Sequence, residues 1–119
     1  MNSKQTVLQG AATDISPVIL TSTGKVAGFV DARTGQSCFF GIPYAEPPVG
    51  SLRFKPTVPK KPWSSTFDAS RFGAAGPQVF DPTEGNYEEF TGEKPESQKN
   101  PWVGSEDNLT LNVWTPGVD

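Results

Sequence analysis

The side chains available for catalysis in this sequence are limited by the absence of histidine from all 119 residues. Ser–His and Cys–His nucleophilic catalysis need an imidazole to accept a proton, so neither can be complete within this chain. A His-ligated metal site is excluded for the same reason. The only cysteine, Cys38, precedes Phe39 and Phe40 and is predicted to be a small buried hydrophobic residue. We therefore expect no catalytic residue, no metal site and no cofactor in this chain.

Three aromatic residues within positions 76–107 indicate that this part of the chain is partly ordered. Tyr87, Phe90 and Trp102 occur in a long irregular stretch, and a purely solvated loop rarely carries three aromatics. A tryptophan on such a loop offers an apolar face to an acyl chain and a cation–π surface to a cationic group. The alternative is that these rings only anchor the loop.

Charge and hydropathy exclude several classes of function. Ten Lys/Arg against 13 Asp/Glu give a net charge of −3, so the whole chain lacks the basic footprint of a protein that binds nucleic acid or an anionic membrane. No apolar run approaches the roughly 20 residues of a transmembrane segment. The N-terminus lacks the apolar stretch of a signal peptide, which favours a cytoplasmic location without excluding secretion.

The elements that must position these residues begin with a predicted β-meander over residues 18–42. Val18–Leu20 is a short apolar run, residues 26–30 alternate as an extended strand, and Ser37–Ile42 forms a third strand. Turn signals separate the three, which predicts an antiparallel sheet.

Two irregular stretches and a strand follow. Residues 43–75 form a proline-rich connector that aromatic rings are expected to anchor by burial, namely Phe54, Trp63, Phe67 and Phe72. Residues 76–107 form the second irregular stretch, in which Asp81–Glu84 predicts the start of a short helix. Alternating apolar residues over 108–116 then predict a strand.

A set of motifs in one order resembles a known family. Residues 40–54, FGIPYAEPPVGSLRF, are similar to the N-terminal signature of the type-B carboxylesterase/lipase family, the cholinesterase-like branch of the α/β-hydrolases. Further similar motifs are Gly24–Gly28, Pro62-Trp63, Asp68-Ala69, Phe72-Gly73, Pro77-Gln78 and Ser105–Pro116 (SEDNLTLNVWTP). Together they cover roughly residues 18–117.

The resemblance implies an α/β-hydrolase fold in which this chain supplies the N-terminal antiparallel strands and a long lid-like loop of a single domain. Enzymes of the family hydrolyse carboxylic esters with a Ser in G-x-S-x-G, an acid and a His, and an H-G-G-G turn forms the oxyanion hole. None of these elements occurs here. The implied partner is therefore the C-terminal remainder of the same hydrolase on a second chain, the implied substrate is a small ester, and this chain alone is expected to be inactive.

Some residues acquire roles from the resemblance. The loop before the S-E-D motif is a lid in related lipases and lines the gorge in cholinesterases, so Trp102, Tyr87 or Phe90 is expected to face the substrate. The Arg of L-R-F pairs with the Glu of S-E-D in the family, which here are Arg53 and Glu106. Truncating one partner of such a pair costs about 3–5 kcal/mol where the pair is buried.

A disulfide that the family often carries is missing. The two family cysteines that close the long loop correspond here to Gly76 and Asn108. Residues 77–107 are therefore expected to be more mobile than a stapled loop, and the double loss fits a reducing compartment.

Two other interpretations remain open at this point. One is a cholinesterase-like domain that has lost catalysis and serves adhesion or partner binding. The other is an independently folding β module, which the low apolar content and the exposed edge of strand 109–115 disfavour.

Overall fold

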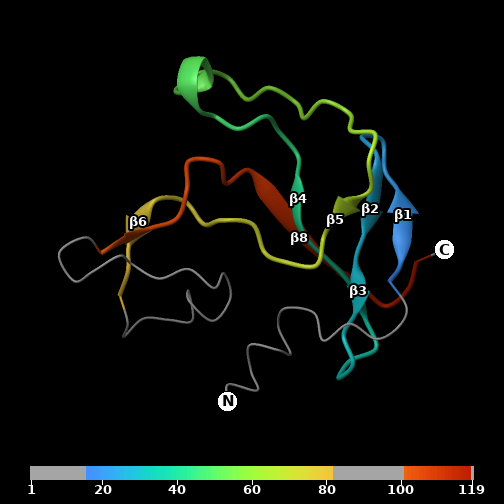
Figure 1. The fold of residues 1–119 in the computed structure, drawn as a ribbon. Coiled ribbons are helices and arrows are strands. Elements are labelled where there is room, and N and C mark those ends of the chain that lie inside the picture. The colour runs from blue at the N-terminus through green and yellow to red at the C-terminus, as the bar shows by residue number, and fades with distance from the viewer. Residues whose placement is uncertain (1–15, 82–100, 119) are drawn as a thin grey trace.

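Short strands dominate the computed structural model, which describes residues 16–81 and 101–118 (Figure 1). The strands are β1 (Val18–Leu20), β2 (Lys25–Ala27), β3 (Phe29–Val30), β4 (Ser37–Pro43), β5 (Phe67–Asp68), β6 (Gln78–Val79), β7 (Trp102–Val103) and β8 (Thr110–Thr115), and the 3-10 helix η1 is Gly50–Leu52. Over these residues no helix has the length and apolarity to cross a bilayer.

The strands form two three-stranded sheets and a two-stranded ribbon. The first sheet has the order β1-β2-β5, in which β1 and β2 are antiparallel and β5 runs parallel to β2. The second has the order β3-β4-β8, and both of its pairings are antiparallel. β6 and β7 form the ribbon. β8 is thus the last strand of its sheet within the described part of the chain.

The expected single strand over residues 26–30 is wrong, because the chain divides at Gly28 and its two halves join different sheets. The backbone at Gly28 passes so close to the Cys38 carbonyl and the Phe39 ring that a side chain would collide with both. Its N–H donates to the Pro17 carbonyl at 2.9 Å instead of continuing a ladder. The alternation of apolar residues persists across this break, which is why the pattern did not reveal it.

The core lies where the two sheets meet along β4. Phe39 packs with Val26 and Ala69 on one side of the strand, and Phe40 packs with Phe29 and Cys38 on the other. Phe72 stacks on Phe40 with the ring centroids 4.2 Å apart and the planes 9° apart. Both faces of β4 are therefore buried, which the run of buried residues from Ser37 to Gly41 reflects.

The proline-rich connector is anchored by some of the expected rings. Trp63 donates its indole N–H to the Lys25 carbonyl at 2.9 Å and packs on Phe67. Phe54 is the exception, because its side chain is 96% exposed and its backbone has a φ of 57°. The prediction that Phe54 buries its ring is wrong: the left-handed turn after η1 directs the ring outward.

The second irregular stretch contains more order at its ends than the sequence suggested. β6 pairs with β7 in antiparallel register, with Gln78 opposite Val103 and Val79 opposite Trp102. The predicted helix start at Asp81–Glu84 extends into residues 82–100, which lie outside the described residues, as do Tyr87 and Phe90.

Candidate functional site

The neck of the long loop, defined as residues 75–80 and 101–108, is closed by backbone hydrogen bonds. Besides the β6–β7 pairs, Phe80 N–H donates to the Pro101 carbonyl at 2.7 Å and Ser105 N–H donates to the Ala75 carbonyl at 2.9 Å. Gly104 has a φ of 91°, and a Cβ there would strike the carbonyls of Ala75 and Gly76. The close approach of the two sides of the neck thus depends on glycine.

Trp102 is the predicted ligand-contacting residue that the structure describes, and it lies on the neck. Its side chain is 61% exposed, and its cross-strand partner Val79 is 53% exposed. Facing residues of an antiparallel pair lie on the same side of the ribbon, so the two form one exposed apolar surface. A surface of this kind can hold the hydrocarbon part of a ligand, although it contains no group for chemistry.

Arg53 and Glu106 form an ion pair with 2.7 Å between Nη2 and Oε1. Their side chains are 51% and 44% exposed, so the pair is solvated rather than buried. The 3–5 kcal/mol of a buried pair therefore does not apply, because water screens the attraction and about 0–1 kcal/mol is usual at such exposure. The Arg53 guanidinium also lies 5.3 Å from the centroid of the Phe54 ring.

Gly76 and Asn108, the two positions at which the resemblance implies a disulfide in related proteins, lie side by side at the neck. A Cβ built on Gly76 would be 3.5 Å from Asn108 Nδ2. The Asn108 amide donates to the Ser105 carbonyl at 2.8 Å. This hydrogen bond, to a residue three positions earlier, fixes the orientation of the Asn108 side chain beside Gly76.

A hollow of about 640 Å³ lies between β4, the connector and the start of β8. Pro43, Trp63 and Phe67 contribute apolar walls, and Lys60, Ser65 and Asp107 contribute polar groups. Its volume is in the range of small-molecule sites. Cys38, the one thiol of the chain, is not among its lining residues. Sequence reasoning missed this hollow, because small residues such as Gly41 and Gly73, which open the space, give no pattern of their own.

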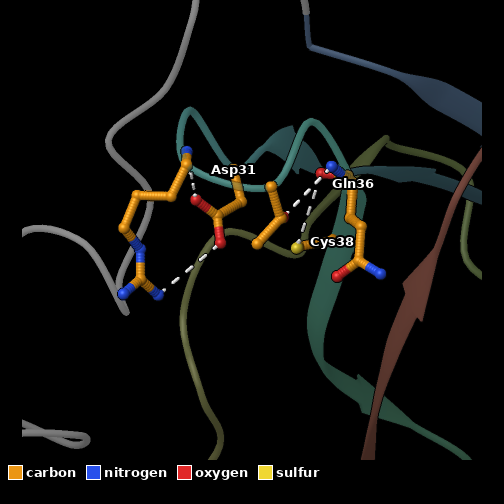
Figure 2. Close-up of polar contacts among 5 residues, drawn as sticks. Asp31, Gln36 and Cys38 are labelled. Carbon is orange, nitrogen blue, oxygen red and sulfur yellow. Dashed lines mark hydrogen bonds and ion pairs between the residues drawn. The ribbon is translucent and has the colours of Figure 1, made fainter.

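The single thiol is unsuited to nucleophilic attack. Cys38 is 1% exposed, and Figure 2 shows its sulfur directed at the Gln36 carbonyl, 3.7 Å away, with Asp31 across the same turn. Burial raises the pKa of the Cys38 thiol, and the negative charge of Asp31 raises it further. The thiol therefore stays protonated at neutral pH and is not an activated nucleophile.

Comparison with known proteins gives a consistent result over nearly the whole chain. A family model described as "Carboxylesterase family" matches residues 15–119. The chain is 42% identical over 111 residues to an acetylcholinesterase of Electrophorus electricus, a match that covers 91% of this chain and 17% of the relative. It is 40% identical over 105 residues to a pyrethroid hydrolase of Rattus norvegicus, which covers 85% of this chain and 18% of the relative.

Solved structures agree with the sequence matches. A crystal structure of a Geobacillus stearothermophilus carboxylesterase superposes with a TM-score of 0.57 at 32% identity, covering 86% of this chain and 17% of the other. In each of these matches the chain spans less than a fifth of the length of the longer protein.

Proposed function

The chain belongs to the carboxylesterase family, and from that premise we propose that it forms the N-terminal part of a serine carboxylic-ester hydrolase. Its strands are those of an α/β-hydrolase carboxylesterase, as the solved neighbours show. The neck of the long loop then becomes the part of this chain that faces the substrate, and catalysis belongs to polypeptide beyond these 119 residues.

The proposed reaction is acyl transfer through a covalent intermediate. A serine oxygen adds to the ester carbonyl as its proton passes to a histidine, and the resulting tetrahedral oxyanion collapses to an acyl-enzyme as the protonated alcohol leaves. Water then adds to the acyl-enzyme and releases the carboxylic acid and the serine. This chain has no histidine to accept either proton, so we propose that it is inactive alone.

The free edge of β8 is the observation that carries the proposal. β8 pairs with β4 along one edge and, within the described part of the chain, has no partner along the other. Val113 and Trp114, which point to opposite faces, are 39% and 53% exposed. Exposed apolar side chains on both faces of an edge strand indicate a surface that further polypeptide covers. We propose that the remainder of the hydrolase supplies the next strand.

The lid-like role of the long loop belongs to the same proposal. Trp102 and Val79 supply the apolar surface at its neck, and Tyr87 and Phe90 occur between them in the sequence. An ester of modest size could place its acyl or alcohol group against this surface while its carbonyl reaches the serine. The names of the relatives, acetylcholinesterase and pyrethroid hydrolase, are consistent with ester substrates.

The test is purification of the 119-residue chain from its natural source under native conditions, followed by mass spectrometry and an assay with p-nitrophenyl acetate. We expect hydrolysis only in fractions in which this sequence accompanies, or continues into, polypeptide with G-x-S-x-G and a histidine. Val113→Lys should abolish this assembly and its activity, whereas the matched change Leu20→Lys, on an exposed position of β1, should preserve both. Hydrolysis by the 119-residue chain alone, or a companion polypeptide without the serine motif, would overturn the proposal.

A further inference from the structure

A long loop between β4 and β5 carries an unusual concentration of positive charge. Residues 47–61, here named the basic loop, contain Arg53, Lys55, Lys60 and Lys61, four of the ten Lys and Arg residues of the chain, and no Asp or Glu. The whole-chain charge of −3 conceals this local excess. Figure 1 shows the loop, with η1 at its far end, extending away from the two sheets.

The base of the basic loop is held closed. Glu46 N–H donates to the Val58 carbonyl at 2.8 Å, and Lys61 N–H donates to Glu46 Oε1 at 2.8 Å. Lys60 Nζ lies 3.5 Å from the other carboxylate oxygen of Glu46. Several prolines stiffen the chain between these contacts. The Arg53–Glu106 ion pair ties the loop to the segment between β7 and β8.

Phe54 occupies the most exposed part of the loop. Every residue from 53 to 59 is exposed, and the Phe54 ring is 96% exposed. A φ of 57° is costly for an aromatic residue, and such strain persists where the surrounding structure enforces it. The fold therefore holds an apolar ring in water between two cationic side chains, Arg53 and Lys55.

We propose that the basic loop is an interfacial anchor that inserts Phe54 into an anionic lipid surface. Glu106 and Glu46 pair with Arg53 and Lys60, and among the described residues neither Lys55 nor Lys61 has an ion-pair partner. The Lys55 ammonium group, next to the ring in the chain, meets lipid phosphates or carboxylates while the ring enters the boundary below the headgroups, and Lys61 at the base of the loop adds to the positive charge. The anchor is independent of ester hydrolysis and goes beyond the proposed function.

The mixture of side chains favours a lipid surface over the interior of a larger protein. A protein surface that covered both Phe54 and Lys55 would have to supply an acidic partner for the ammonium group, because an unpaired buried ammonium group is strongly unfavourable. At a lipid interface the same two residues are compatible, because a lysine keeps its charge among the headgroups while its stem and the neighbouring ring contact acyl chains.

The first experiment measures co-sedimentation of the longest form of the protein that can be isolated with vesicles of phosphatidylcholine alone and of phosphatidylcholine mixed with phosphatidylserine. We expect binding to the anionic vesicles only, weakening as salt is added. Phe54→Ser and Lys55→Glu should each weaken it by roughly tenfold. Leu20→Ser and Lys25→Glu make matched changes at exposed positions outside the loop and should leave binding unchanged.

The second experiment separates lipid contact from contact with protein. Cys38 is buried, so a polarity-sensitive maleimide dye on Phe54→Cys reports on the loop. In the longest form of the protein that can be isolated, we expect rapid labelling and a blue shift on anionic vesicles. Slow labelling in that form would show that protein covers position 54 and would overturn the proposal. Binding that is equal on neutral vesicles, or that Phe54→Ser and Lys55→Glu leave intact, would also overturn it.

Discussion

Arg53 Nη2 lies 2.7 Å from Glu106 Oε1, and this contact joins the basic loop to the segment between β7 and β8. The two residues are far apart in the sequence, so the pair fixes the position of one loop against the neck of another. Because both side chains are about half exposed, the pair contributes more to geometry than to the free energy of folding.

A double-mutant cycle with Arg53→Ala and Glu106→Ala measures this contribution. We expect a coupling free energy of about 0.5–1 kcal/mol in urea unfolding, decreasing at high salt. Limited proteolysis should be faster in both single variants, because the neck loses a contact to the basic loop. A coupling above about 3 kcal/mol would show that the pair is desolvated and would contradict the exposure described here.

A disulfide between positions 76 and 108 should form readily. In the double variant Gly76→Cys/Asn108→Cys the two thiols would lie on facing sides of the neck, where a Cβ at 76 is 3.5 Å from the present Asn108 amide. Closing a loop of this length stabilises by about 3–4 kcal/mol in the chain-entropy model, provided that the geometry is not strained. The measurement is the melting temperature with and without reductant.

The control for this disulfide is each single cysteine variant. Neither should show a reductant-dependent melting temperature, because Cys38 is buried and cannot be the partner. An oxidised double variant that melts no higher than its reduced form would show that the neck is not held as described.

Gly104 should resist substitution for two separable reasons. Gly104→Ala places a Cβ at a φ of 91° and against the carbonyls of Ala75 and Gly76, so we expect a loss of about 2–4 kcal/mol. Gly35→Ala is the matched control, because Gly35 has a φ of 70° but nothing within 4 Å of a Cβ, and it should cost only about 1 kcal/mol. Equal losses in urea unfolding would show that the close approach at the neck contributes nothing.

The sequence predicted those features that depend on periodicity and on motif order. The alternation of Leu109, Leu111 and Val113 indicated the strand observed as β8. The motifs around Phe40–Phe54 and Ser105–Pro116 identified the carboxylesterase family, which the family model confirms. Both signals are local, so a single sequence was enough to find them.

What the sequence missed depends on close approach and on three-dimensional position. The division at Gly28 is invisible to periodicity, because Val26 and Phe29 are both apolar and both buried, but in different sheets. We expected Phe54 to be buried because aromatic side chains usually pack in a core. The left-handed turn after η1 instead directs this ring into solvent. The roles proposed for Trp102, Tyr87 and Phe90 and the cytoplasmic location remain predictions.

Glu46 should make the stability of the basic loop depend on pH. The hydrogen bond from Lys61 N–H lowers the pKa of the Glu46 carboxyl below its ordinary value of 4.5, and the charge of Lys60 lowers it further. A folded-state pKa below the unfolded value means that the carboxylate stabilises the fold above the unfolded pKa and that this contribution is lost as pH falls through the folded pKa. We expect the parent chain to be more stable than Glu46→Gln at neutral pH, with the difference shrinking below about pH 4.5. Urea unfolding across this range is the measurement, and a difference that stays constant down to the lowest pH would show that Glu46 has the same pKa in the folded and unfolded chains.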